Sequence, residues 1–478
     1  MALMVYDTLA RRETEFVPRD PGKVSIYTCG VTPYNYCHVG NARPYIVWDV
    51  IRRYLLYKGY SVRYVQNFTD VDDKIIRRAK EEGVTPLTIA DRYINEYFRD
   101  MDALGIIRAD VYPRVTDHIT DIIDMVKQLI AKGYAYVVDG DVYYSVTSFP
   151  EYGKLSGRSL EDLKVGARID VDERKRDPMD FALWKASKED EPAWDSPWGP
   201  GRPGWHIECS VMALKYLGPG FDFHGGGSDL VFPHHENEIA QSEGALGETF
   251  SRYWVHNGFV NMAGEKMAKS VGNVVRVRDV LEKYPGSVLR YYMLSTHYRS
   301  PIDFNMDDMP GAQKGWERLR NLEDNLERAV RGQEVTMPAE PSTFIQEFIA
   351  TLDKHRAVFE AAMDDDFNTA KALGALFELA RYLNSYLAKG DVNGERAAAL
   401  AKGRDLFLSL GNVLGLTGVD SDHKDKALVD DLVQLVAELR QEARARRDFA
   451  VADKVRDRLA KLGIILKDTP SGPSWQYK

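Results

Sequence analysis

Apolar positions in the first hundred residues alternate between the spacing of strands and the spacing of helices. A β-branched and aromatic run over 24–28 predicts a buried strand, and apolar residues three to four apart over 45–56 predict a helix. A second strand follows over 61–68, and a strong N-cap signal within 69–79 opens a second helix. The sequence therefore predicts an α/β fold of the Rossmann type, a parallel sheet that binds ligands at the carboxyl ends of its strands.

This alternation is interrupted between about 114 and 203. A helix over 117–132 leads to two short β-rich runs around an Asp-Gly turn within 134–145, which is the pattern of a hairpin. We therefore predict an inserted α+β segment within the α/β domain. After residue 204 the expected elements are, in order, a strand over 221–224, a glycine turn over 225–230, a helix that opens near 232, a strand over 253–256 and a polar loop over 262–273.

The C-terminal part shows apolar residues at helical spacing from about 312 onward and predicts an all-α C-terminal half. The expected helices cover 314–332, 342–363, 369–388, 394–414, 426–448 and 449–459. A short strand over 463–468 follows the last of these helices.

Composition and charge narrow the class of protein. The 478 residues carry a net charge of -9, with 44% hydrophobic and 28% charged positions, which is ordinary for a soluble globular protein. Three cysteines in a chain of this length do not form a disulfide framework, so we expect a cytoplasmic protein with free or metal-binding thiols. We find neither a signal peptide pattern nor a long apolar run. Between 438 and 467, nine basic residues face five acidic ones, an excess that suits either a phosphate backbone or a solvated helix face.

The connection over 27–44 joins the first predicted strand to the first predicted helix. Because a helix N-terminus offers N–H groups and the positive end of a dipole, this crossover suits a phosphate group. A thiol, Cys29, stands at the end of the strand, and His38 stands at the start of the helix. A histidine at this place is also common as an ordinary capping or core residue.

A metal site is one interpretation of the cysteines and of the segment over 232–240. His234 and Glu238 are four residues apart on a predicted helix, so their side chains point the same way. With Cys29 and Cys209 they make a plausible tetrahedral zinc set, in which the carboxylate leaves room for a substrate thiolate. The spacing alone fits a surface ion pair and two core cysteines as well.

Two further features suggest nucleotide chemistry. Lys266 and Lys269 lie in a Gly-bounded loop, where two ammonium groups would suit a polyphosphate transition state. The glycine turn that ends at Asp229 would bring backbone close to a ribose and place a carboxylate on its hydroxyl groups. Solvated surface lysines and a plain glycine turn are the alternatives.

Six sequence blocks, taken together, resemble the cysteinyl-tRNA synthetase family, a branch of the class I aminoacyl-tRNA synthetases. The blocks read Tyr-Thr-Cys-Gly-Val-Thr-Pro-Tyr, His-Val-Gly-Asn-Ala-Arg-Pro, Asn-Phe-Thr-Asp-Val-Asp-Asp-Lys-Ile, Gly-Trp-His-Ile-Glu-Cys-Ser, Phe-Pro-His-His-Glu-Asn-Glu-Ile-Ala-Gln-Ser-Glu and Lys-Met-Ala-Lys-Ser. The resemblance runs from about residue 5 to the end. Relative to the general class signatures, Val39 replaces isoleucine, Ala268 replaces serine and Asn41 replaces the second histidine; none of these changes removes a charged group.

The resemblance implies ATP-dependent activation of L-cysteine to an adenylate and its transfer to the terminal adenosine of tRNA(Cys), by a cytoplasmic and monomeric enzyme. It implies one Zn²⁺ held by Cys29, Cys209, His234 and Glu238, and catalytic roles for His38, Asn41, Lys266 and Lys269. It implies an ATP site, with Mg²⁺, formed by His38, Gly40, Asn41, Asp229, Lys266, Lys269 and Ser270. It implies a cysteine pocket formed by Cys29, Gly30, Thr69, Trp205, His206 and His224. It also implies that thiolate preference excludes serine without an editing domain.

The resemblance also implies an order of domains. These are a catalytic Rossmann first half (1–113), a connective insertion (114–203), the Rossmann second half (204–255), a lysine-loop and stem-contact region (256–312), a helical bundle (313–418) and an anticodon-binding domain (419–478). In the last of these, Trp475 would stack on a base.

Two other functions stay open at this point. A cysteine:aminosugar ligase of mycothiol synthesis would share the adenylating core and the zinc site, but such enzymes are shorter and lack the basic C-terminal end. A non-catalytic tRNA-binding relative would not need His38, Lys266 and Lys269. Some members of the family also form cysteine persulfide with pyridoxal phosphate on lysines, for which Lys74 is a candidate.

Overall fold

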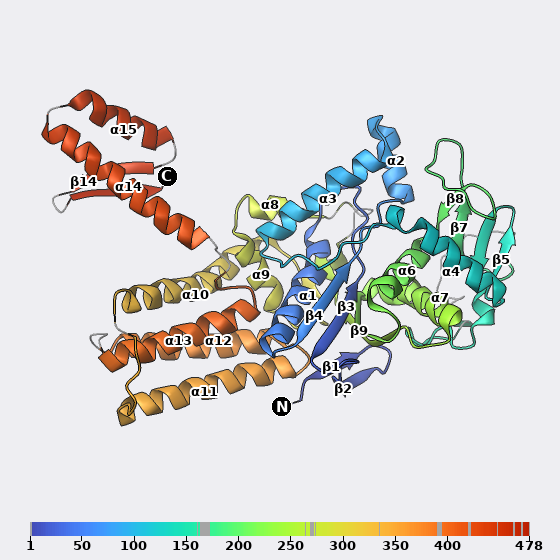
Figure 1. The fold of residues 1–478 in the computed structure, drawn as a ribbon, viewed down its shortest axis with the longest axis horizontal. Coiled ribbons are helices and arrows are strands. Elements are labelled where there is room, and N and C mark those ends of the chain that lie inside the picture. The colour runs from blue at the N-terminus through green and yellow to red at the C-terminus, as the bar shows by residue number, and fades with distance from the viewer. Residues whose placement is uncertain are drawn as a thin grey trace. The chain divides into compact units, whose positions relative to one another are not determined.

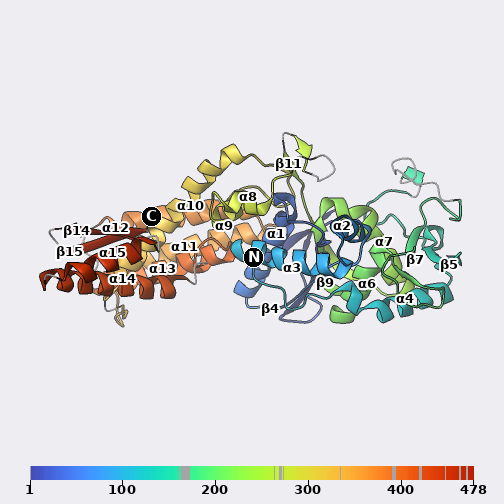
Figure 2. The ribbon, with the colours of Figure 1, turned by 90° about the horizontal axis from the view of Figure 1, so that it is seen from above.

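The computed structural model divides the chain into two compact units, 1–417 and 418–478. Figures 1 and 2 show the fold in two views at right angles. The described residues are 2–159, 161–162, 173–262, 264–267, 272, 274–333, 335–389, 394–418, 422–446, 448–461, 464–469 and 472–477.

A four-stranded sheet forms the centre of the first unit. Its strands are β3 (Lys23–Thr28), β4 (Ser61–Gln66), β9 (Phe221–Gly227) and β10 (Ser251–Asn257). The order is β10-β9-β3-β4 and every pairing is parallel, which confirms the predicted sheet. The glycine turn expected over 225–230 is wrong in its first part, because β9 continues through Gly227 and pairs there with β10.

Successive residues of a strand point to opposite faces of the sheet, and the two faces carry separate cores. Ile26 belongs to a core with helix α1 (Val39–Tyr57), whereas Tyr27 belongs to a core with α4 (Ile119–Ala131), α6 (Trp205–Leu217) and α7 (Glu236–Leu246). The helices α2 (Asp73–Glu82) and α3 (Pro86–Ala103) follow β4. The carboxyl ends of β3 and β9 therefore lie between α1 and the α6–α7 pair.

The segment between α3 and α6 contains its own antiparallel sheet, at the right of Figure 1. Its strands are β5 (Ala135–Val138), β6 (Asp141–Tyr144), β7 (Phe181–Ala186) and β8 (Gly201–Pro203), in that order. The predicted hairpin is confirmed, since Val138 pairs with Asp141 across the turn. β7 and β8 were not predicted, because β8 lies in a Pro/Gly-rich stretch and β7 is a short run between that stretch and a charge-rich tract.

A small sheet follows β10 and carries the first lysine of the expected loop. It is formed by β11 (Val260–Met262), β12 (Glu265–Lys266) and β13 (Ile302–Asp303), with α8 (Val277–Leu281) and α9 (Gly286–Leu294) between β12 and β13. Another short pair, β1 (Met4–Asp7) and β2 (Arg12–Glu15), opens the chain.

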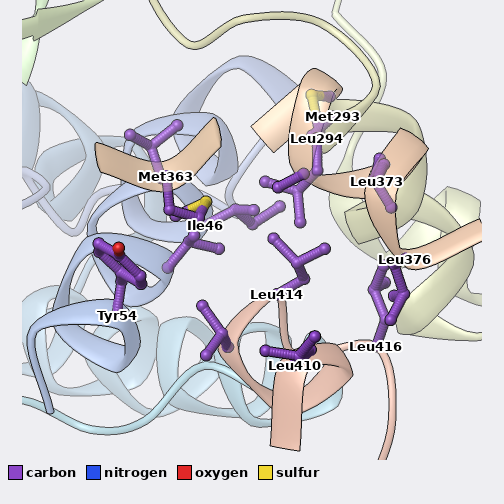
Figure 3. Packing of buried hydrophobic residues seen from close by; sticks show 14 of the residues in the cluster. Ile46, Tyr54, Met293, Leu294, Met363, Leu373, Leu376, Leu410, Leu414 and Leu416 are labelled. Carbon is purple, nitrogen blue, oxygen red and sulfur yellow. The ribbon is translucent and has the colours of Figure 1, made fainter. Parts of the chain in front are cut away.

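Long helices complete the first unit, as predicted. They are α10 (Met309–Val330), α11 (Thr343–Asp364), α12 (Thr369–Leu387) and α13 (Gly394–Val413). Figure 3 shows that Ile46 of α1 lies among Met363 of α11, Leu376 of α12 and Leu410 of α13, in one continuous core. The helix that follows the 27–44 connection is thus anchored in the helical bundle.

The second unit consists of α14 (Asp422–Ala445), α15 (Phe449–Lys461) and the antiparallel strands β14 (Ile464–Thr469) and β15 (Gly472–Tyr477). The expectation of an all-α C-terminal half therefore needs a correction at its very end, where the sequence predicted one strand rather than a pair. Among the described residues, none of the helices combines the length and apolarity that crossing a membrane requires.

Candidate active site

The first turn of α1 forms a capping box that is built from the signature histidine. His38 is the N-cap, its Nδ1 accepts a hydrogen bond from the backbone N–H of Asn41 at 3.2 Å, and the Asn41 side chain accepts one from the His38 backbone N–H at 3.2 Å. This arrangement places the ring proton of a neutral His38 on Nε2. It also explains why Asn at position 41 suits this helix start.

The turn after β3 depends on a glycine. The Gly30 N–H donates to the Asn67 side-chain oxygen at 2.8 Å, and a Cβ at position 30 would lie 1.5 Å from the Asn67 carbonyl oxygen. The two strand ends therefore approach more closely than any other residue would allow. Asn67 in turn lies 3.8 Å from the Cys209 sulfur and donates to Thr69 Oγ1 at 3.3 Å.

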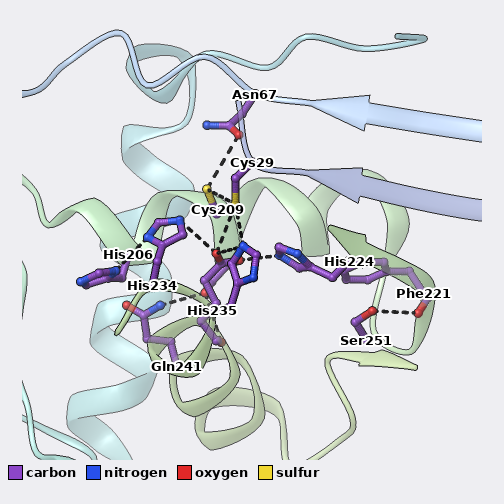
Figure 4. A network of polar contacts seen from close by, with 12 residues as sticks. Cys29, Asn67, His206, Cys209, Phe221, His224, His234, His235, Gln241 and Ser251 are labelled. Atoms are coloured by element: carbon purple, nitrogen blue, oxygen red, sulfur yellow. Dashed lines mark hydrogen bonds and ion pairs between the residues drawn. The ribbon is translucent and has the colours of Figure 1, made fainter. Parts of the chain in front are cut away.

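Four side chains from three segments meet below this turn (Figure 4). Cys29, Cys209, His234 and Glu238 each offer a ligand atom, and these atoms all lie within 4.8 Å of one another. The Cys29 sulfur lies 3.7 Å from the Cys209 sulfur and 3.5 Å from Glu238 Oε1. His234 Nε2 lies 3.1 Å from the same carboxylate oxygen. The four residues that sequence spacing alone left undecided are thus brought together.

A second layer of histidines surrounds this group, and sequence reasoning found only part of it. His224 Nε2 lies 2.8 Å from Glu238 Oε2, and His235 Nε2 lies 3.3 Å from the Cys29 sulfur. His235 also contacts His256 at 2.8 Å between ring nitrogens. Cys29, His224, His235 and Glu238 form an alternative set of four ligand atoms within 4.8 Å. We call these six side chains the buried cluster: Cys29, Cys209, His224, His234, His235 and Glu238.

Burial controls the protonation of this region. It lowers the pKa of His224 and of His256 to about 3, so both rings are neutral near pH 7. It also raises the pKa of the Cys29 thiol and of the Glu238 carboxyl well above their ordinary values. Two thiols and a carboxyl group packed against neutral imidazoles supply the donor types that zinc prefers, and a bound cation would favour their ionised forms.

An open cleft of about 500 Å³ lies above the buried cluster and reaches it through Cys29. We call it the central cleft. Its predicted site residues are Cys29, Gly30, His38, Gly40, Asn41, Trp205 and Asp229. Lys74 lines it as well, with its ammonium group 5.7 Å from the centre of the Tyr34 ring. A larger surface groove of about 750 Å³ beside α11 and α13 is lined by no cysteine or histidine.

Three residues predicted for the cysteine pocket lie beyond the lining of the central cleft. Thr69 and His224 are buried, and His206 contacts His234 at 2.9 Å between Nδ1 atoms. Trp205 is 44% exposed and its ring stacks on that of His234, with centroids 4.3 Å apart. Trp205 therefore forms the boundary between the central cleft and the buried cluster.

The lysine loop is described only in part. Lys266 pairs with Asn261 in the β11–β12 ladder, and the Met267 N–H donates to the Val260 carbonyl at 3.0 Å. Lys269 and Ser270 lie outside the described residues. The chain after the loop returns to α1, where the Val39 N–H donates to the Val275 carbonyl at 2.9 Å.

Comparisons with known proteins agree with this fold. Residues 15–314 match the family model described as "tRNA synthetases class I (C) catalytic domain", and residues 358–418 match the DALR domain. The methionyl-tRNA synthetase of Mycobacterium tuberculosis, solved with methionyl-adenylate, is 19% identical with a TM-score of 0.60 over 82% of this chain and 90% of that one. A LeuRS from Agrobacterium radiobacter K84, solved with tRNA and LeuAMS, is 13% identical with a TM-score of 0.61 over 85% and 86% of the two chains. At these identities the solved structures support the fold, which is that of a class I aminoacyl-tRNA synthetase.

Curated relatives narrow this class. The cysteine–tRNA ligases of Pelotomaculum thermopropionicum and Desulforamulus reducens are 55% and 54% identical, each over 99% of both chains. That of Moorella thermoacetica is 53% identical over 99% of this chain and all of its own. The chain belongs to the cysteine–tRNA ligase family of class I tRNA synthetases.

Proposed function

We propose that this protein activates L-cysteine with ATP and transfers it to the 3′-terminal adenosine of tRNA(Cys). The observation that carries this proposal is the position of Cys29. Its side chain belongs to the buried cluster, and it also lines the central cleft, into which the first turn of α1 opens. A site for a thiol and a site for a triphosphate are therefore continuous.

The cysteine end would be held by Cys29, Cys209, His234 and Glu238 through one Zn²⁺. The donor set fits this ion, since two sulfurs, one imidazole and one carboxylate converge at a buried point. Bound zinc would coordinate the substrate thiolate and discriminate against the hydroxyl of serine, because zinc prefers the softer sulfur ligand. Trp205 would cover the side chain of the substrate, and His224 and His206 would hold the orientation of Glu238 and His234.

The nucleotide end would use the N-terminus of α1. Gly40 and Asn41 line the central cleft at the positive end of the helix, which favours the phosphates of ATP. His38, with its proton on Nε2, would donate to a phosphate oxygen, and Asp229 would accept from the ribose hydroxyl groups. Lys266 and Lys269, with Mg²⁺, would stabilise the pyrophosphate leaving group.

The first step would be attack of the cysteine carboxylate on the α-phosphorus of ATP, in line with the departing pyrophosphate. A carboxylate is already ionised near pH 7, so no general base is required. The contribution of the protein is to hold both reactants in register. In the second step the terminal ribose hydroxyl of the tRNA would attack the adenylate carbonyl and release AMP.

The C-terminal part would bind the tRNA. Among the described residues, the exposed basic side chains are Arg444 on α14, Arg446 just after it, and Lys454, Arg456 and Arg458 on α15, whereas Arg440 is buried. Such a set would attract the phosphate backbone near the anticodon. A monomeric state, a cytoplasmic location and a contact from Trp475 stay predictions.

Pyrophosphate exchange and tRNA charging test the proposal together. We expect wild-type protein to support cysteine-dependent ATP–pyrophosphate exchange and to transfer labelled cysteine to tRNA. We expect Cys209→Ser to lose both activities and its zinc. Exchange without transfer to tRNA would instead support the aminosugar ligase, and the lack of exchange by folded, zinc-containing protein would support a non-catalytic relative.

A further inference from the structure

Arg43 lies in the second turn of α1 and is completely buried. Its guanidinium group donates to four backbone carbonyls in two distant segments. Nη1 donates to Gly258 at 2.9 Å and to Phe259 at 2.8 Å, and Nη2 donates to His297 at 3.3 Å and to Ser300 at 2.6 Å. Within the described part of the chain, no carboxylate forms an ion pair with Arg43. A buried cation without a carboxylate is costly, so this arrangement requires an explanation other than an ion pair.

The four carbonyls belong to the two segments that begin the small sheet. Gly258 and Phe259 directly precede β11, and the 297–300 loop directly precedes β13. These segments also bond to each other, since the Gly258 N–H donates to the Tyr298 carbonyl at 2.8 Å and the Ile302 N–H donates to the Phe259 carbonyl at 2.9 Å. The junction is tight, because a Cβ at position 258 would lie 2.6 Å from Ser300 backbone atoms.

One of these segments is a wall of the central cleft. Asn257, Gly258, Phe259 and Val260 line the cleft together with Gly40 and Asn41, which stand on the first turn of α1. Arg43 therefore joins the helix whose first turn lines the central cleft to a second segment that lines the same cleft. α1 also contacts β11 itself.

We propose that Arg43 is a positioning residue that holds the 258–260 wall at a fixed distance from the N-terminus of α1, and so sets the shape of the cleft for ATP. The inference rests on the proposed function and names a residue that acts without touching the nucleotide. A fork of two Nη groups can reach two segments at once, which the single ammonium of a lysine cannot do. Four carbonyl acceptors bond the two Nη groups and so offset part of the cost of burying the charge, whereas Nε has no hydrogen-bond partner among the described residues.

Arg290 provides a matched comparison within the same unit. It is equally buried, but it pairs with the Asp49 carboxylate and donates to the Leu414 carbonyl at 2.6 Å. These partners join α9 to α1 and to the end of the helical bundle, and neither Arg290 nor its partners line the central cleft. Loss of Arg290 should therefore destabilise the fold without a specific effect on ATP.

The test is steady-state pyrophosphate exchange, measured with ATP and cysteine varied separately. It is carried out on Arg43→Lys, Arg43→Met and Arg290→Met. Zinc content and melting temperature are measured for each protein. For both Arg43 variants we expect kcat/KM for ATP to fall by about 10²-fold, the size of effect that a misplacement of 1 Å produces. The KM for cysteine and the zinc content should stay within about twofold, because Arg43 does not contact the buried cluster. For Arg290→Met we expect a lower melting temperature and unchanged KM values.

Three results would overturn this inference. They are an equal rise of the KM for cysteine and for ATP in the Arg43 variants, the same ATP-specific loss in Arg290→Met, or Arg43 variants with wild-type kinetics. If the Arg43 variants do not accumulate as folded protein, Gly258→Ala replaces them in the test. This variant disturbs the same junction from the opposite side, so it should also raise the KM for ATP alone. If the wild-type protein lacked exchange activity, the proposed function would be wrong. If the wild type were active and the Arg43 variants had the same kinetics, only the positioning role of Arg43 would be wrong.

Discussion

The two ends of the central cleft are built from different parts of the polypeptide. At the cysteine end, the specific groups are the side chain of Cys29, which directly follows β3, and buried side chains from α6, η4 (Val231–His235) and α7, supported by neutral histidines. At the nucleotide end they are largely backbone groups, namely a helix N-terminus and a glycine-rich strand end beside an open space of about 500 Å³. Selection of one amino acid requires a specific set of ligands, whereas a triphosphate is recognised by N–H groups that every residue carries.

The largest effect should come from removing a ligand at the cysteine end. We expect Cys209→Ser to abolish cysteine-dependent exchange and to lose its metal, because three remaining donors leave the buried site incomplete. Metal content and exchange are the measurements, and Cys37→Ser, which changes a cysteine outside the buried cluster, is the control. A Cys209→Ser protein with full exchange would contradict the assignment.

Substitution of His38 should reduce activity through the nucleotide end of the cleft. Both His38→Asn and His38→Ala should reduce kcat for exchange by about 10²- to 10³-fold, as expected when one donor to a developing charge is lost. Asparagine is a good N-cap, so only the alanine variant should also lose about 1 kcal/mol of unfolding free energy. Exchange kinetics and denaturant unfolding separate the two roles. If His38→Asn retained full activity, the capping role would be sufficient and the phosphate contact would be wrong.

Gly30→Ala should affect both ends less strongly, since the residue lies between them. A Cβ 1.5 Å from the Asn67 carbonyl oxygen would push β3 and β4 apart at their ends and move Cys29. We expect exchange to fall by about 10-fold or more, with KM raised for cysteine and for ATP alike. An unchanged KM for either substrate would show that Gly30 does not position both ends.

Low pH should reduce the unfolding free energy of the protein through the buried histidines near the cysteine end. Burial lowers the pKa of His256 to about 3 from its ordinary value of 6.5. Between about pH 3 and pH 6.5, His256 is therefore protonated in the unfolded chain and neutral in the folded chain. His256 therefore contributes full stability above pH 6.5, and its own share of the unfolding free energy should fall by about 1.4 kcal/mol per pH unit as the pH drops below that value, in addition to the shares of the other buried histidines. Urea unfolding of metal-free wild type and His256→Gln from pH 7.5 to 4.5 tests this expectation. The variant should show a shallower slope, and equal slopes would contradict it.

The sequence predicted the parts of the fold that have a clear period. The parallel sheet and the long helices of the bundle were predicted, because each spans enough residues to show its spacing. Strands of two or three residues, such as β8 and β11–β13, have no readable period, and the glycine run was assigned to a turn although it continues β9. Local pattern carries no information on pairing with a distant strand.

The candidate site, like the fold, was predicted in part from the sequence. Family motifs drew attention to Cys209 and His234, and the structure brings them together with Cys29 and Glu238. His235 was overlooked because it stands beside His234 without a spacing of its own. Arg43 stands in one of the family blocks, but its contacts could not be predicted from the sequence, since its partners are carbonyl groups in remote segments and such groups have no sequence signature.

The central claim is that the cysteine end selects the amino acid and the nucleotide end binds ATP independently. Calorimetric titration of ATP and of cysteine into metal-depleted and zinc-restored protein tests it most directly. We predict that removal of the metal abolishes cysteine binding and that added zinc restores it. The Kd for ATP should stay within about twofold of its value in the zinc-containing protein. Retained cysteine binding in depleted protein, or an equal loss of ATP binding, would contradict the account.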